Sequence, residues 1–296
     1  MARVHYDEFS YFHENAAEWG LPHPSVVVSR EAVTLSSGRR LSYLRFGVDE
    51  PTVVFIHGGA QNAHTFDTVN LALGEPSIAL DLPGHGHSDP SPYGLSAIAP
   101  HAADVVEALR ELCSQPIVLV GMSLGGLTSL LVARELPDLV ARLILVDITP
   151  GVTAAKAKHI TDFVNGPTSF DDFDQLLELT MRFNPTRSES SLRRGILHNA
   201  RQRDDETWVW RHQQHGPATL SAPPTGDLWG VLSELGQPVT LVRGLAAGSV
   251  VDDDDVKNFR ERCATGDVVE VPEAGHSVQG DQPLVLAALC AERLGH

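Results

Sequence analysis

Six short apolar runs along the chain each predict a buried β-strand. Their residues are apolar almost throughout instead of alternating, which is typical of strands covered on both faces of a parallel sheet. The runs are residues 52–56, 77–80, 117–120, 143–146, 239–242 and 267–271. Ahead of them, residues 32–35 and 40–46 flank a turn at 36–38 and predict an antiparallel pair.

Helical periodicity fills the intervals between these strands. Residues 97–112 and 124–136 carry apolar positions at helical spacing, and residues 283–294 begin with Pro283 at the first turn, where a helix tolerates proline. Residues 6–19 predict a short amphipathic helix that ends at Gly20. Alternating strands and helices predict an α/β fold with a mostly parallel, doubly wound sheet.

One segment interrupts the alternation. Roughly 90 residues between Asp147 and Val239 contain no buried-strand pattern, and 170–183 and 188–201 read as amphipathic helices. We therefore expect a core of residues 1–150 and 228–296 and an inserted helical cap of residues 151–227, with 228–235 returning the chain to the core. The aromatic residues there suggest a moderately apolar pocket, although at least half are expected to form the cap's own core: Phe163, Phe170, Phe183, Trp208, Trp210 and Trp229.

The sequence Gly121-Met122-Ser123-Leu124-Gly125 lies between a predicted strand and a predicted helix. A nucleophile elbow needs this setting, because its turn is so tight that glycines must stand two residues before and after the serine. The turn lifts the hydroxyl clear of the sheet. It also turns the Leu124 N–H and the helix N-terminus toward a developing negative charge.

A second candidate loop directly follows the predicted strand at residues 52–56. His57-Gly58-Gly59-Ala60 can direct a backbone N–H at a substrate oxyanion, and we expect the Gly59 N–H to act with that of Leu124, with Ala60 as the alternative. His57 itself is expected to bind loop backbone.

His276 follows the last strand on the loop Ala274-Gly275-His276-Ser277. A serine nucleophile needs a base, because its hydroxyl is scarcely ionised at neutral pH. This loop emerges at the sheet edge where Ser123 also emerges, so His276 is the predicted general base.

Composition narrows the partners. The net charge of −16 disfavours nucleic acid and anionic membranes, both of which reward basic patches. No apolar run has the length of a membrane span, and the acidic N-terminus does not resemble a secretory signal. Three widely spaced cysteines, Cys113, Cys263 and Cys290, suggest neither a disulfide framework nor a zinc site. We expect a cytoplasmic protein that has no cofactor or metal; its oligomeric state is not predicted.

Together these motifs resemble the α/β-hydrolase family over essentially the whole chain. The segment from Asp81 to Asp89 is similar to a loop of that family and is expected to be structural. The resemblance implies hydrolysis through a Ser–His–acid triad and an oxyanion hole, without a metal.

The acid departs from the family pattern. It usually lies a few residues after the strand at 239–242, but residues 245–249 contain no carboxylate. Asp147 ends the preceding strand, and some members, including a group of haloalkane dehalogenases, place their acid there. Asp252 is the alternative, although residues 252–255 look like the acidic first turn of a helix. The alternative, purely structural role for Asp147 is to cap the loop that starts the insertion.

The predicted activity is cleavage of a small, moderately apolar ester by a carboxylesterase or lactonase. A carbon–carbon bond hydrolase of a dienoic keto-acid is one alternative, and Arg182, Arg193 and Arg194 are candidates to bind its acidic group. A catalytically idle, ligand-binding member of the fold is another. Dehalogenases and epoxide hydrolases are disfavoured, because their elbow nucleophile is an aspartate.

Overall fold

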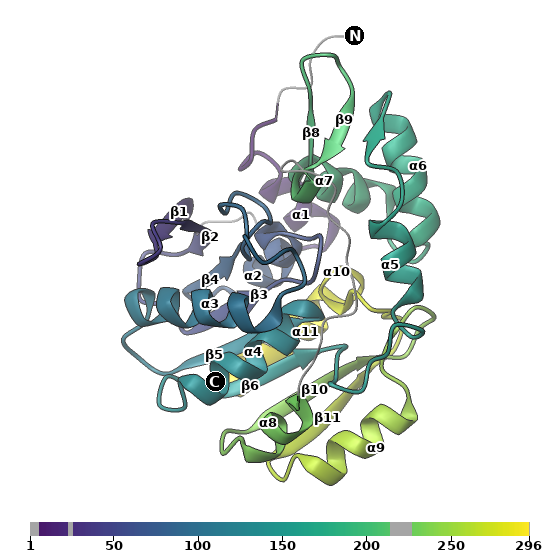
Figure 1. Ribbon diagram of the computed structural model, residues 1–296. Helices are drawn as coiled ribbons and strands as arrows, with labels where there is room; N and C mark the ends of the chain where they lie inside the picture. The colour runs from purple at the N-terminus through teal and green to yellow at the C-terminus, as the bar shows by residue number, and fades with distance from the viewer. Residues whose placement is uncertain (1–5, 23–25, 214–226, 296) are drawn as a thin grey trace.

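The computed structural model describes residues 6–22, 26–213 and 227–295. Its centre is an eight-stranded sheet in the order β1-β2-β4-β3-β5-β6-β10-β11, in which β1 and β2 pair antiparallel, as do β2 and β4, and all other neighbours are parallel. The predicted doubly wound α/β sheet is confirmed (Figure 1). The strands are β1 (Val28–Thr34), β2 (Arg40–Phe46), β3 (Val53–Ile56), β4 (Ser77–Leu80), β5 (Ile117–Met122), β6 (Val140–Val146), β10 (Val239–Gly244) and β11 (Gly266–Val271).

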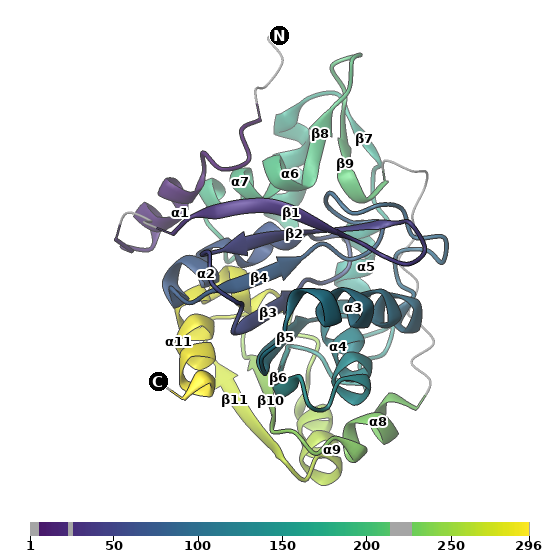
Figure 2. The same ribbon diagram turned by 90° about the vertical axis from the view of Figure 1, so that its left-hand side faces the viewer.

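Helices cover both faces of this sheet, as Figures 1 and 2 show. One face carries α3 (Ile98–Leu112), α4 (Leu124–Glu135), α8 (Leu228–Glu234) and α9 (Asp253–Arg262). The other carries α1 (Phe12–Glu18), η1 (Ala63–Phe66), α2 (Asp67–Leu73), α10 (Val278–Asp281) and α11 (Pro283–Leu294).

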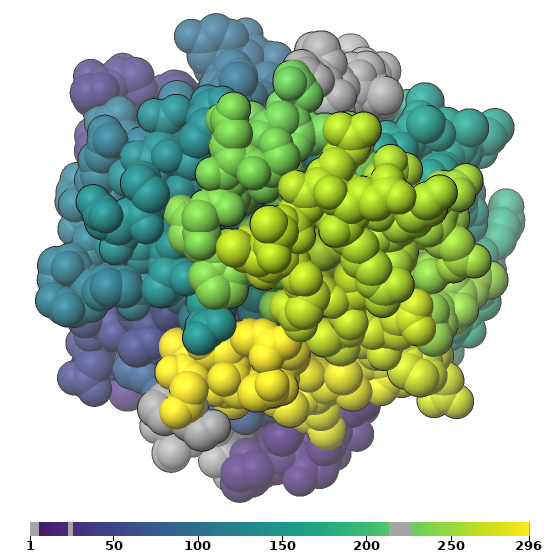
Figure 3. All heavy atoms as spheres, turned by 90° about the horizontal axis from the view of Figure 1, so that it is seen from below, coloured from purple at the N-terminus to yellow at the C-terminus, as the bar shows by residue number. Residues whose placement is uncertain are grey.

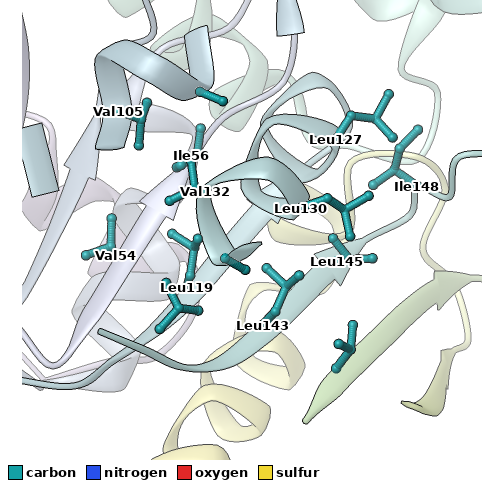
Figure 4. Close-up of a cluster of buried hydrophobic side chains, with 14 of the residues drawn as sticks. Val54, Ile56, Val105, Leu119, Leu127, Leu130, Val132, Leu143, Leu145 and Ile148 are labelled. Carbon is teal, nitrogen blue, oxygen red and sulfur yellow. The ribbon is translucent and has the colours of Figure 1, made fainter. Parts of the chain in front are cut away.

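Successive residues of β3 serve the two faces in turn. Val54 and Ile56 belong to the cluster under α3 and α4, and Val53 and Phe55 to the cluster under α2 and α11. Figure 4 shows the first cluster, where side chains of α4 pack onto those of β5 and β6. All four residues of β3 are fully buried. Each such side chain contributes roughly 1.5–3 kcal/mol, which explains why this strand is apolar throughout.

Residues 151–213 form a separate layer beyond one edge of the sheet (Figure 2). It contains α5 (Lys158–Val164), α6 (Phe173–Phe183) and α7 (Glu189–Asn199), then η2 (Arg211–Gln213). Between them lies a small sheet, β7 (Ser169–Phe170), β9 (Trp208–Trp210) and β8 (Ala200–Gln202), which periodicity did not predict because its strands are two or three residues long. We call residues 151–213 the cap segment. The division into core and cap domains stays a prediction, and 214–226 lie outside the described residues.

Two predicted elements need correction. The N-terminal helix begins at Phe12 and not at Tyr6. Tyr6 and Glu8 are instead drawn to side chains elsewhere: the Tyr6 hydroxyl is 2.8 Å from His198 Nδ1, and Glu8 accepts a hydrogen bond from Arg30 Nε at 2.6 Å. The last strand, β11, lies at the edge of the sheet, so its residues are mostly half-buried or exposed and not covered on both faces.

The three cysteines are buried and free. Seen from below in Figure 3, the yellow C-terminal helix α11 lies beside the yellow-green segment that holds α9 and β11. Within the described ranges, no helix is both long and apolar enough to cross a membrane.

Candidate active site

Ser123 stands at the turn between β5 and α4, and its φ of +53° is rare for a residue with a side chain. The two flanking glycines make the turn possible. A Cβ on Gly121 would lie 2.5 Å from Ser129 Oγ, and one on Gly125 would lie 2.2 Å from the Ile56 carbonyl oxygen. Both positions therefore exclude any side chain, and the sequence spacing has this physical cause.

His276 and Asp147 meet across the end of the sheet. The distance between His276 Nδ1 and Asp147 Oδ2 is 2.9 Å; the imidazole side chain is 10% exposed and the carboxylate is fully buried. A carboxylate oxygen can only accept, so Nδ1 carries a proton, and in the neutral imidazole Nε2 keeps its lone pair. In the described part of the chain, Nε2 has no hydrogen-bond partner, and none joins it to the Ser123 hydroxyl.

The loop after β10 holds the Asp147 carboxylate. Oδ1 accepts from the Gly244 N–H at 3.1 Å and from the Ser249 hydroxyl at 2.6 Å, and Oδ2 accepts from the Val250 N–H at 3.0 Å. With His276, these donors satisfy a buried charge that would otherwise be very costly. The loop in which the family usually carries the acid thus contains no acid here and instead supplies hydrogen-bond donors to Asp147.

Asp252 has a different set of contacts. It is the N-cap of α9 and forms a capping box with Asp255, and its carboxylate lies 2.7 Å from Lys156 Nζ. The structure therefore brings Asp147, and not Asp252, into contact with His276. The predicted acidic first turn of a helix at residues 252–255 is confirmed.

Gly59 and Leu124 both line one cavity together with Ser123 and His276. Neither backbone N–H has a partner among the described residues, so both are free to bind an oxyanion. The Gly59 loop is fixed from the cap segment, because Asn199 Nδ2 donates to the Ala60 carbonyl at 2.6 Å. Ala60 also lines the cavity, at a φ of +62°.

His57 has the predicted structural role. Its Nε2 accepts the Leu82 N–H at 2.9 Å and its Nδ1 lies 2.7 Å from the Gly58 carbonyl. Burial lowers its pKa, so the ring stays neutral. The segment that begins at Asp81 is likewise built around that buried carboxylate: burial would raise the Asp81 pKa, but Arg30, 2.7 Å away, helps to lower it below its usual value.

The cavity between the sheet edge and the cap segment has a volume of about 620 Å³. Its wall is largely apolar, with Leu127, Ile148, Val152, Ile160 and Val250 among its members. The cap aromatics divide between two roles. Phe170 and Trp208 form the core of the cap segment, whereas Phe183 lines the cavity and Phe163 and Trp210 do both. Trp229 packs on the main core instead.

The three arginines expected as anion-binding candidates differ in their surroundings. Arg182 lines the cavity but is exposed. Arg193 stacks on Phe173, outside the cavity. Arg194 lines the cavity but is paired with Glu18. A fourth arginine, Arg187, also lines the cavity. It lies in a loop with no periodic pattern, so no local sequence signal distinguishes it from other arginines.

A second polar cluster joins the core to the cap segment, and its three residues also line the cavity. His64, Asp67 and His198 each offer a ligand atom, and these atoms lie within 4.8 Å of one another. The His64 and His198 rings, however, are stacked with centroids 3.7 Å apart at 13°, so their in-plane lone pairs do not converge on one ion. Each His64 nitrogen is also 2.8 Å from a carboxylate, Glu8 or Asp67, which favours a hydrogen-bonded imidazolium over a metal site.

This cluster predicts a pH-dependent stability. Burial alone would lower the pKa of His64, but Asp67 and Glu8 raise it to about 9. The stabilisation is therefore complete below the unfolded value of about 6.5 and is lost as the pH rises through 9. We expect the free energy of unfolding of the wild type, relative to His64→Asn, to fall by on the order of 3 kcal/mol over this range. Urea denaturation of both proteins at pH 6 to 10 measures the difference; a pH-independent difference would contradict it.

A serine on a strand–turn–helix elbow above a mostly parallel sheet defines the α/β-hydrolase class of enzyme. The sequence profile of the alpha/beta hydrolase family matches residues 53–289, and the chain belongs to that family. It is 40% identical to the esterase Rv0045c of Mycobacterium tuberculosis over 286 residues, which cover 95% of this chain and 93% of the relative.

Solved structures agree with this assignment. A crystal structure of the esterase Rv0045c covers 99% of both chains with a TM-score of 0.87 and 38% identity. The structure of an E-2-(acetamidomethylene)succinate hydrolase covers 91% of this chain and 100% of its own, with a TM-score of 0.78 and 21% identity; that likeness concerns the fold alone.

Proposed function

We propose that this enzyme is a carboxylesterase with Ser123 as nucleophile, His276 as general base and Asp147 as the acid of the triad. The observation that carries the proposal is the 2.9 Å contact between His276 and the buried Asp147, on a cavity that Ser123 also lines. The 40% identity to a protein named esterase supports the same activity.

The first half of the reaction follows from the tautomer of His276. Because Nδ1 donates to Asp147, Nε2 accepts the proton of the Ser123 hydroxyl as the oxygen attacks the ester carbonyl. Asp147 stabilises the resulting imidazolium, which then protonates the departing alcohol. The Gly59 and Leu124 N–H groups stabilise the oxyanion, aided by the N-terminus of α4.

The second half repeats these steps with water. His276 removes a proton from a water molecule, which attacks the acyl-enzyme carbonyl and releases the carboxylic acid and free Ser123. A largely apolar cavity of about 620 Å³ suits a small, moderately apolar ester. No step requires a cofactor or a metal.

A fluorophosphonate probe tests the nucleophile directly. The Ser123 oxygen should displace fluoride from phosphorus, and peptide mapping should place the adduct on Ser123. Heat-denatured protein is the control, since labelling requires an activated serine. In parallel, p-nitrophenyl esters from acetate to decanoate should be hydrolysed, and their chain-length profile measures the pocket.

The two measurements separate the alternatives. Labelling of Ser123 without hydrolysis of any ester would move the proposal to a carbon–carbon bond hydrolase. If Ser123 is not labelled and no ester is hydrolysed, the protein is a ligand-binding member of the fold and the esterase proposal is refuted.

A further inference from the structure

Arg187 lies in the loop between α6 and α7, on the wall of the cavity that also contains Gly275, His276 and Gly280. Its guanidinium rests on the backbone of α10: a Cβ on Gly280 would come within 2.9 Å of Arg187 Cζ. The cation is thereby placed beside the loop of the predicted general base.

This guanidinium is poorly satisfied by the described protein groups. Nη2 donates to Ser191 Oγ at 2.6 Å, but the buried Nε has no partner and no carboxylate lies within ion-pair distance. The side chain is half-buried. Burial lowers the pKa of Arg187, and the carboxylates of Asp281 and Glu18, which lie beyond ion-pair distance, offset part of that effect.

The nearby acids are held by other groups. Asp281 accepts from the Gly275 N–H at 2.8 Å and from Thr186 Oγ1 at 3.2 Å. Glu18 binds Arg194 and Ser188. Arg194 therefore has its own counter-ion, whereas Arg187 faces a cavity without one, and a guanidinium in such a place favours a bidentate oxyanion.

We propose that Arg187 binds a carboxylate carried by the substrate, so that the preferred esters have one anionic end. This inference rests on the proposed esterase function and names its substrate class. The carboxylate can belong to the acyl part, as in a monoester of a dicarboxylic acid, or to the alcohol part, as in an acetylated hydroxy acid. In both kinds of ester, Arg187 would hold the carboxylate while Ser123 attacks the ester carbonyl.

Matched ester pairs test the proposal. The monomethyl esters of succinate, glutarate and adipate are each compared with the neutral methyl ester in which an amide replaces the free carboxylate. O-acetyl-4-hydroxybutyrate is compared in the same way with its amide. The ratio of kcat/KM for anionic over neutral partners should fall about 10- to 100-fold in Arg187→Gln, the worth of one charge-assisted contact. The pair with the larger ratio in the wild type shows which part carries the carboxylate.

Three variants guard against a general loss of structure. Arg187→Lys should restore part of the ratio, and Gly280→Ala should lower it by displacing the guanidinium without removing its charge. Arg193→Gln removes an arginine from outside the cavity and should leave the ratio unchanged. An unchanged ratio in Arg187→Gln would overturn the proposal while leaving the esterase intact.

A binding measurement remains decisive if no ester is cleaved. The Kd of glutarate is measured by calorimetry for the Ser123→Ala variant and for the double variant Ser123→Ala, Arg187→Gln. Glutarate should bind the single variant, and its Kd should be at least tenfold higher for the double variant. Equal binding to the two proteins, or no binding to either, would refute the carboxylate site independently of the esterase.

Discussion

Replacing Ser123 with alanine should lower kcat for ester hydrolysis by about five orders of magnitude or more, because the acyl-enzyme can no longer form. The residual rate should come from the oxyanion donors and substrate binding. The fold should persist. The Ser123 hydroxyl has no hydrogen-bond partner in the described part of the chain, so its removal leaves no buried group unsatisfied.

The measurement is kcat for p-nitrophenyl butyrate, together with thermal unfolding of both proteins. Ser233→Ala, which alters an exposed serine on α8, is the matched control and should retain wild-type kcat. If Ser123→Ala kept near-full activity with an unchanged melting temperature, the elbow serine would not be the nucleophile.

The core of the fold could be predicted because its signals are local. The run at 117–120, the glycines at 121 and 125 and the apolar face of 124–136 lie within 20 consecutive residues and encode one strand–turn–helix unit. Steric contacts of 2.5 Å or less then account for both glycines. Such a unit is recognisable without any knowledge of the remaining chain.

Other features depend on contacts distant in sequence. The N-terminal segment is not helical from Tyr6, because Tyr6 and Glu8 bind His198, His64 and Arg30. The short strands of the cap segment lie below the length at which alternation can be detected. Arg187 becomes noticeable only when α10 is placed beneath it.

The identity of the triad acid also depends on contacts distant in sequence. Asp147 directly follows β6, whereas Asp252 lies several residues after β10. The sequence alone does not show which of these two loops reaches His276. The structure shows that Asp147 binds the imidazole, whereas Asp252 caps α9 and pairs with Lys156.

Asp147→Asn should lower kcat about 10⁴-fold with a much smaller change in KM, while Asp252→Asn should stay within about twofold of wild type. The amide has one acceptor and one donor, but both carboxylate oxygens of Asp147 face donors. If its oxygen stays toward Gly244 and Ser249, its NH₂ faces His276 and favours the tautomer with the proton on Nε2. That tautomer cannot accept the proton of Ser123.

The other amide orientation also fails. With its oxygen toward His276 and Val250, the NH₂ would face the Gly244 N–H, and leaving that buried donor unsatisfied costs about 1–3 kcal/mol. Asp147→Asn should therefore also unfold at lower urea concentration, which separates it from Asp252→Asn, where asparagine is still a good N-cap. Kinetics with p-nitrophenyl butyrate and urea unfolding of both variants supply the two readouts. Loss of activity confined to Asp252→Asn would assign the acid to the loop after β10, and the contact between His276 and Asp147 would then be structural.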